Sequence, residues 1–282
     1  MRAIVVHGGV SGVAKEITPL DYAVLAGRSQ PTALDAVEAA VRAMEDDPAL
    51  QAGYGSTLDR DGALELDAGI ADGNTGRSGA VAGVTVRHPV TLARRVMSDT
   101  PHVLMSGAGA EALGADMERL EDTSPEQRRR WEQARAAGTL GPGHYGTPEQ
   151  VETVGAIALD DDGHLAAASS TGGVFGKLPG RVGDAPVFGA GFYASTSAAA
   201  VGTGVGELFL ETLACFRAGL LIEGGTAPQL ACEEVIETLG RRGPYSAGLL
   251  ALDADGRVGA AYRGGSWAVE GMDGRLAAAL VP

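Results

Sequence analysis

The chain has 282 residues, of which 45% are hydrophobic, and this is enough for a substantial core in one large domain or two small ones. Acidic residues outnumber Lys and Arg by 36 to 22, and the net charge of -14 argues against nucleic acid or an anionic membrane surface as a partner. The N-terminal apolar run is too short for a signal peptide and no run approaches the roughly 18 residues of a membrane span, so we expect a soluble, cytoplasmic protein.

The first hundred residues predict one strand and two helices. An apolar run over residues 3–6 is typical of a short buried strand, which the glycine pair 8–9 is expected to end. Apolar residues recur at helical spacing over residues 33–44, with Thr32 as the N-cap. A second helix is predicted over residues 92–97.

Three similar short sequences lie between apolar runs, at residues 58–62, 159–163 and 252–256. Each has an aspartate that can hydrogen-bond its own backbone and a glycine that accepts positive φ, so each is predicted to form a hairpin turn. A calcium loop would need about twelve residues and a terminal glutamate, so we do not predict a metal here. The turns imply antiparallel strands from both halves of the chain, stacked as two sheets.

The middle of the chain is polar. Residues 116–150 are rich in charge, glycine and proline, and we predict a flexible linker over about residues 136–152. A hairpin is expected directly after it, from alternating apolar positions on both sides of the turn at residues 159–163.

The last third predicts two helices and a closing hairpin. Leucines recur at helical spacing over residues 208–220, and a further helix is predicted over about residues 228–239 with Thr226 as its N-cap. The hairpin is expected over residues 247–262.

The residues that usually bind metals or cofactors form no convincing pattern. Residues 107–112 match a dinucleotide fingerprint, but the chain then enters a charged segment, so we favour a packing turn there. Cys215 and Cys232 lack metal-ligand spacing and are predicted to be buried thiols. The five histidines show no zinc motif; they are His7, His88, His102, His144 and His164.

Hydroxyl groups and opposite charges gather after residue 168, where a glycine-rich loop carries Thr171, Arg181 and Asp184 beside a predicted strand. Polar groups on such loops are typical of a binding or catalytic site. Threonine in a strand is usually a β-former, and its hydroxyl needs a base to act as a nucleophile. The α-amino group of a chain's first residue, with a pKa of about 7.7 to 8.0, can be that base. Thr153 would gain one only by cleavage after Glu152.

Several short motifs occur in a recognisable order. They are His7-Gly8-Gly9, Ala52-Gly53-Tyr54-Gly55, Glu65-Leu66-Asp67-Ala68, Asp72-Gly73, Ala80-Val81-Ala82-Gly83-Val84, Thr153-Val154-Gly155-Ala156, Ser170-Thr171-Gly172-Gly173, the run from Lys177 to Asp184, Gly189-Ala190-Gly191, and Thr203-Gly204 before Gly206-Glu207. On these motifs, over most of its length, the chain resembles the plant-type asparaginase and isoaspartyl peptidase family of N-terminal-nucleophile (Ntn) hydrolases.

The resemblance implies an α+β fold, a four-layer αββα sandwich in a single domain of residues 1–282. It also implies a precursor that cleaves itself between Glu152 and Thr153 into an α chain of residues 1–152 and a β chain of residues 153–282. By similarity Thr153 is the nucleophile of both self-cleavage and hydrolysis, and Thr171 positions it.

The remaining site residues follow from the same resemblance. Thr203 and the backbone N–H of Gly204 would form the oxyanion hole. Arg181 and Asp184, beside Gly206, would bind the α-carboxylate and α-ammonium of the substrate. Without the neighbouring hydroxyls, Arg181 and Asp184 would be interpreted as a surface ion pair.

We therefore predict an amidohydrolase that acts on β-aspartyl dipeptides, L-asparagine or both, without a cofactor, as a homodimer of αβ units. The resemblance leaves open a structural sodium or potassium ion held by backbone carbonyls. Glu152 stands where family members commonly have glycine or aspartate, and the substrate preference stays open. Two alternatives remain: a glycosylasparaginase-like hydrolase, and an unprocessed amino-acid-binding protein on the same fold.

Overall fold

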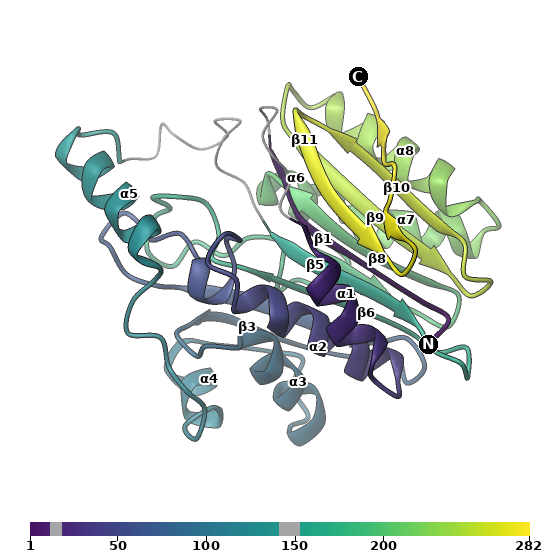
Figure 1. Cartoon of the computed structure of the whole chain (residues 1–282), viewed down its shortest axis with the longest axis horizontal. Helices are drawn as coiled ribbons and strands as arrows, with labels where there is room; N and C mark the ends of the chain where they lie inside the picture. Colours follow the sequence, from purple (N-terminus) through teal and green to yellow (C-terminus); the bar gives the residue numbers. More distant parts are fainter. Residues whose placement is uncertain (12–18, 141–152) are drawn as a thin grey trace.

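The structure, a computed structural model, describes residues 1–11, 19–140 and 153–282. Two β-sheets stack face to face, and helices cover both outer faces (Figure 1). The predicted four-layer αββα sandwich is thereby confirmed.

Within the described residues the first sheet has eight strands in the order β12-β11-β1-β5-β6-β2-β3-β4. Their bounds are β1 Ala3–Ser11, β2 Leu66–Asp72, β3 Arg77–Val84, β4 Leu104–Ser106, β5 Val154–Leu159, β6 Leu165–Thr171, β11 Ser266–Gly271 and β12 Gly274–Arg275. The helices on its outer face are α1 Asp21–Arg28, α2 Ala33–Glu45, α3 Pro89–Asp99 and α4 Gly107–Leu113 (Figure 1).

The second sheet has five strands in the order β13-β10-β9-β8-β7, again within the described residues. Its strands are β7 Phe192–Ala194, β8 Ala198–Gly204, β9 Ala247–Asp253, β10 Val258–Arg263 and β13 Ala279–Leu280. The helices α6 Gly206–Thr212, α7 Ala214–Glu223 and α8 Pro228–Gly240 cover its outer face (Figure 1). Cys215 and Cys232 lie buried in α7 and α8, as predicted.

Side-chain alternation along the strands separates three apolar layers. One layer lies between the sheets and includes Ile157 of β5, Val201 of β8 and Leu250 of β9. The other two lie under the helices: Val154 and Ala156 of β5 pack toward α2, and a third group packs β8 and β9 against α7 and α8. Because both faces of each sheet are covered, most strand positions are apolar.

Strand β1 differs from the prediction, because it continues through the glycine pair to Ser11. Its pairing with β11 shifts between His7 and Val10, and Gly9 adopts a φ of 98° there. The glycines therefore make a bulge within the strand, not its end. This pairing also brings β11, which sequence reasoning had missed, into the first sheet.

Two helix boundaries in the second half were predicted wrongly. The N-cap of α8 is Ala227, without a side-chain cap, whereas Thr226 was expected. The single helix expected over residues 208–220 is two helices, because Leu213 adopts a left-handed φ of 50° between α6 and α7. The N-cap at Thr32 is confirmed, since its side chain accepts a hydrogen bond from the Asp35 N–H.

The three aspartate turns share one geometry: the Asp Oδ1 accepts backbone N–H groups two and four residues ahead, at 2.8 to 3.1 Å for Asp59, Asp160 and Asp253. The second and third turns join antiparallel partners, β5 with β6 and β9 with β10, as predicted. The first is not a hairpin, because β2 begins only at Leu66. Its backbone instead accepts a hydrogen bond from Trp131.

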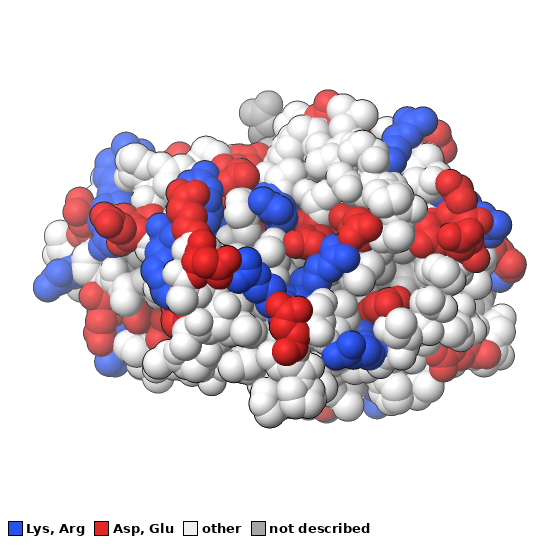
Figure 2. Space-filling model, turned by 90° about the horizontal axis from the view of Figure 1, so that it is seen from below, with Lys and Arg blue, Asp and Glu red and all other residues white. Residues whose placement is uncertain are grey.

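Trp131 belongs to α5, Pro125–Ala136, which projects at one end of the molecule in Figure 1. The helix ends at the first residue of the predicted linker, and Leu140 packs against the cluster around Trp131. Residues 141–152 lie outside the described part of the chain, so the linker stays a prediction. No helix among the described residues is long and apolar enough to cross a membrane. On the face shown in Figure 2, acidic and basic side chains are interspersed.

Candidate active site

The space between the two sheets changes from apolar to polar toward one end. On β5, Ile157 and Leu159 point into this space, and alternation therefore turns Gly155 and Thr153 the same way. On β6, Leu165 points inward, so Thr171 does too. Thr153 directly precedes β5 and Thr171 is the last residue of β6, and because the two strands are antiparallel both residues lie at the same end of the sheet.

Strand register sets these two threonines side by side. Val154 pairs with Ser170 and Gly155 with Ser169, and continuing this register by one residue places Thr153 opposite Thr171. Thr171 in turn pairs with Asp67 of β2 on its other side. The sheet thus presents a row of polar side chains, Thr153, Thr171 and Asp67, toward the second sheet.

The third predicted threonine comes from the facing sheet. Val201 of β8 lies in the layer between the sheets, so Thr203, two residues later, faces the same space. The sheets approach closely here, because a Cβ on Gly155 would lie 3.1 Å from the Val201 Cβ. The fold therefore brings Thr153, Thr171 and Thr203 to one end of one narrow space.

All three threonines are buried, with Thr153 4%, Thr171 3% and Thr203 0% exposed. The hydroxyl of Thr171 accepts a hydrogen bond from the Gly173 N–H at 3.0 Å. Among the described residues the Thr203 hydroxyl has no partner. A buried hydroxyl without a partner costs free energy.

Gly204 needs to be glycine at this position. It adopts a φ of 148°, and a Cβ would lie 2.7 Å from the Ser246 carbonyl oxygen. The backbone after Thr203 therefore takes a conformation that other residues rarely adopt, and it approaches the Ser246 carbonyl more closely than a side chain would allow.

Arg181, Asp184 and Gly206 lie close together. A Cβ on Gly206 would lie 2.8 Å from the Arg181 Nη2 and 2.9 Å from the Asp184 Oδ1. The guanidinium and the carboxylate thus approach the Gly206 Cα, three residues beyond Thr203. Because Gly206 has no side chain, two opposite charges can come together beside the oxyanion-hole candidates.

Glu207 is a partner of Arg181 that sequence reasoning assigned no role. Arg181 donates from Nε and Nη2 to the two Glu207 carboxylate oxygens, at 3.0 and 2.9 Å. Burial opposes the charged guanidinium, but this bidentate pair raises the pKa of Arg181 overall. Glu207 belongs to the Thr203-Gly204 motif region, but the motif does not indicate that its partner is Arg181, which lies 26 residues earlier in the chain.

Asp184 is buried, and its Oδ2 has no hydrogen-bond partner among the described residues. Burial raises the pKa of Asp184 to about 7, although the nearby Arg181 charge opposes the rise. An ionised carboxylate held in this position would be stabilised by an incoming cation, such as an ammonium group.

His7 borders the same space and was not predicted as a site residue. It is fully buried and pairs with Gly155 across β1 and β5, and the centroid of its ring lies 5.8 Å from that of the Trp267 ring, with the two planes tilted by 48°. Burial lowers the pKa of His7 to about 3, and the Thr153 backbone opposes the fall. Neither ring nitrogen makes a hydrogen bond with the described residues, so the neutral imidazole lies near the Thr153 backbone without being bonded to it.

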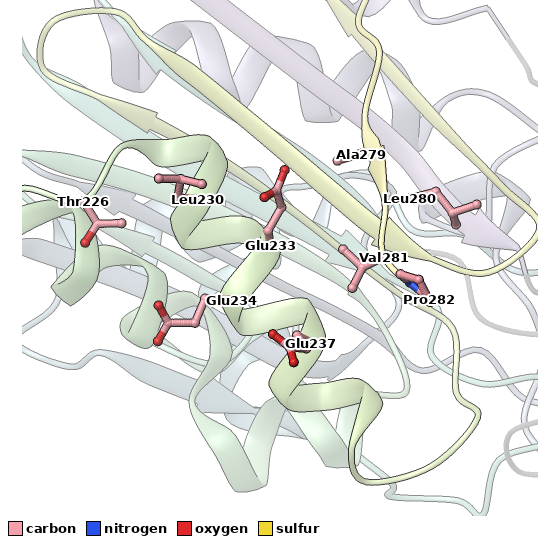
Figure 3. A pocket seen from close by; sticks show the side chains of 9 residues that line it. All are labelled: Thr226, Leu230, Glu233, Glu234, Glu237, Ala279, Leu280, Val281 and Pro282. Carbon is pink, nitrogen blue, oxygen red and sulfur yellow. The ribbon is translucent and has the colours of Figure 1, made fainter.

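Two surface pockets differ in their position relative to the candidate site. A groove of about 840 Å³ lies between α8 and the C-terminal strand, on an outer face (Figure 3). Its polar lining residues are Thr226, Glu233, Glu234 and Glu237, and the others are apolar; none of the predicted site residues lines it. A smaller pocket of about 410 Å³ lies against Arg181 and Glu207, with Tyr245 on its wall. The second pocket is the one beside the site.

One group among the described residues has metal-ligand proximity: Asp160, Asp162 and His164. These residues form the turn between β5 and β6, at the opposite end of β5 from Thr153. The Asp160 oxygens already accept backbone N–H groups of the turn and of Ala33. Their arrangement is accounted for by the turn.

Comparison with known proteins identifies the family. The family model described as asparaginase matches residues 3–275. The chain belongs to the asparaginase family. Asparaginase-family relatives include an isoaspartyl peptidase of Salmonella typhimurium, 45% identical over 90% of each chain. A second is an isoaspartyl peptidase of Escherichia coli, 43% identical over 90% of this chain and 88% of the relative. A third is a plant-type L-asparaginase of Pyrobaculum calidifontis, 43% identical over 93% and 94%.

The match to the family model and to these relatives confirms the family that the motifs predicted, and with it the amidohydrolase class. The individual roles assigned to Thr153, Thr171, Thr203 and Gly204 stay predictions, as does cleavage at Glu152, which lies outside the described residues.

Proposed function

We propose that the chain is a self-processing amidohydrolase that releases L-aspartate from β-aspartyl dipeptides, L-asparagine or both. The observation that carries the proposal is the approach of Arg181 and Asp184 to Gly206, within a few residues of Thr203. Both substrates present a free α-carboxylate and a free α-ammonium beside the scissile side-chain amide. A guanidinium and a carboxylate side by side match those two charges. The names of the isoaspartyl peptidase and L-asparaginase relatives support the same substrates.

The proposed chemistry starts at Thr153. In self-cleavage the Thr153 hydroxyl oxygen attacks the Glu152 carbonyl carbon, its proton passes to the Thr153 nitrogen, and the C–N bond breaks to leave an ester between Glu152 and the Thr153 side chain. Water then hydrolyses this ester, which frees the Glu152 carboxylate, the Thr153 hydroxyl and the Thr153 α-amino group. The freed α-amino group then serves as the general base for later turnovers.

In each turnover the Thr153 Oγ attacks the side-chain amide carbon of the substrate, and the amine takes the Oγ proton. This proton passes to the leaving nitrogen, which departs as ammonia or an amino acid. Water then hydrolyses the acyl-enzyme ester and releases L-aspartate. Thr203 and the Gly204 N–H stabilise the negative charge that develops on the substrate carbonyl oxygen as the transition state forms. Thr171 holds the Thr153 hydroxyl in position.

Mass spectrometry and N-terminal sequencing of the purified chain test the proposal. We expect a fragment that begins at Thr153, and L-aspartate release from β-aspartyl dipeptides or L-asparagine. Thr153→Ala should abolish both cleavage and turnover. A chain that stays at full length and releases no aspartate would contradict the proposal. Sugar-linked asparagine, assayed in parallel, distinguishes a glycosylasparaginase-like activity.

We also propose that two αβ units form a homodimer and that the enzyme is cytoplasmic. Light scattering of the processed protein tests the first statement, with a mass of about twice 28.5 kDa expected. Cell fractionation tests the second. Assays with sodium, potassium or neither test the structural alkali ion that the family resemblance leaves open.

A further inference from the structure

A buried lysine lies beside the site without a role in the proposed chemistry. Lys177 is 0% exposed and is among the largest fully buried side chains. An ammonium group removed from water is costly unless opposite charges and hydrogen bonds surround it. Burial lowers the pKa of Lys177, and the attraction of Asp67 and Glu65 opposes that effect. A buried charge of this kind needs a structural or functional explanation.

The contacts of Lys177 tie a loop to the start of β2. Its Nζ donates a hydrogen bond to the Glu65 carbonyl oxygen at 2.9 Å, and it lies 3.7 Å from the Glu65 Oε2. The same Glu65 carboxylate accepts the Gly180 N–H, at 2.9 and 3.0 Å to its two oxygens. Glu65 therefore holds both ends of the short segment from Lys177 to Gly180, and Arg181 is the next residue.

The ammonium also lies beneath the turn that follows β6. A Cβ on Gly173 would lie 3.0 Å from the Lys177 Nζ and 2.9 Å from its Cδ. Gly173 has a φ of 82° and donates its N–H to the Thr171 hydroxyl. Lys177 thus packs against the turn whose backbone holds Thr171.

Asp67 is a buried carboxylate whose charge also attracts Lys177. Asp67 is fully buried, its Oδ2 has no partner among the described residues, and it attracts both Lys177 and Arg181. With Lys177 present, the nearby carboxylates Glu65 and Asp67 have a cation of their own.

We propose that Lys177 is a positioning residue, which together with Glu65 holds the segment that carries Arg181 in place against the turn that follows β6. This inference rests on the proposed function, because it assumes that Arg181 binds the substrate carboxylate. Lys177 acts through Arg181 and does not touch the substrate. Its removal is therefore expected to weaken binding more than it slows the chemical step.

Lys177→Met tests the inference, because methionine keeps the apolar stem and removes the ammonium. We expect the KM for a β-aspartyl dipeptide to rise about tenfold or more while kcat stays within about threefold, the pattern of lost binding. The Thr153-initiated fragment should still form, and calorimetry should show correspondingly weaker binding of L-aspartate. Arg241→Met is the matched control, since Arg241 pairs with Glu237 on the exposed surface.

A second variant guards against a misfolded protein. Glu65→Gln keeps an acceptor for the Gly180 N–H but removes the charge that faces Lys177, so it should raise KM by about threefold or more. An unchanged KM in both variants would overturn the inference, and so would a joint loss of kcat, self-cleavage and thermal stability, which would mark a purely structural role. If the wild-type chain releases no aspartate, the proposed function fails. Weaker aspartate binding by Lys177→Met would still support the role of Lys177.

Discussion

Gly206→Ala is expected to damage substrate binding selectively. The new Cβ would lie 2.8 Å from the Arg181 Nη2 and 2.9 Å from the Asp184 Oδ1, whereas ordinary contact begins at 3.4 Å. Both charged groups must therefore move by about half an ångström. Charge-assisted hydrogen bonds contribute about 1.5 to 3 kcal/mol each, so weakening one raises KM by roughly 10- to 100-fold. Alanine is a better helix former than glycine in α6, so the fold should persist.

Steady-state release of L-aspartate from a β-aspartyl dipeptide measures this effect, with the Thr153-initiated fragment as a check on processing. Gly109→Ala is the matched control, because a Cβ on Gly109 of α4 would meet no atom within 4 Å. A KM within about twofold of wild type for Gly206→Ala would refute the reasoning, since the added methyl would then leave the two charges in place.

Three further changes test other parts of the molecule. Asp184 must be ionised to bind an ammonium group, and its pKa is raised to about 7, so inhibition by L-aspartate should weaken as the pH falls below that value. Asp184→Asn should remove this pH dependence. A wild-type Ki that stays constant from about pH 5 to about pH 8 would contradict the role of Asp184. Thr203→Val should lower kcat by about 10²- to 10³-fold with little change in KM, because it removes an oxyanion donor; equal loss in Thr203→Ser would contradict that role. Phe192→Ala should lower the free energy of unfolding in urea by about 3 to 5 kcal/mol, because Phe192 is fully buried between the sheets and contacts Gly69. A smaller decrease would indicate that the layer between the sheets collapses around the gap.

Local patterns were enough for much of the fold. The α2 helix, its Thr32 cap and the hairpins at residues 159–163 and 252–256 depend on spacing within a few residues, and these were predicted correctly. The boundary errors have local causes that residue type does not reveal. Leu213 takes a left-handed conformation that sequence favours for glycine, and the glycine pair in β1 makes a bulge because β11 pairs on both sides of it.

The sequence alone determined the candidate chemistry, because motifs such as Ser170-Thr171-Gly172-Gly173 and Thr203-Gly204 occur in the order that carries the family resemblance, and the resemblance names their roles. The tertiary structure decided which of them meet. Thr153 and Thr171 face each other through strand register, and Thr203 joins them from the other sheet through alternation of its side chains. Glu207 on Arg181, and Lys177 on Glu65, could be found only there, since 26 and 112 residues separate these partners and only long-range packing sets charges at such separations beside one another.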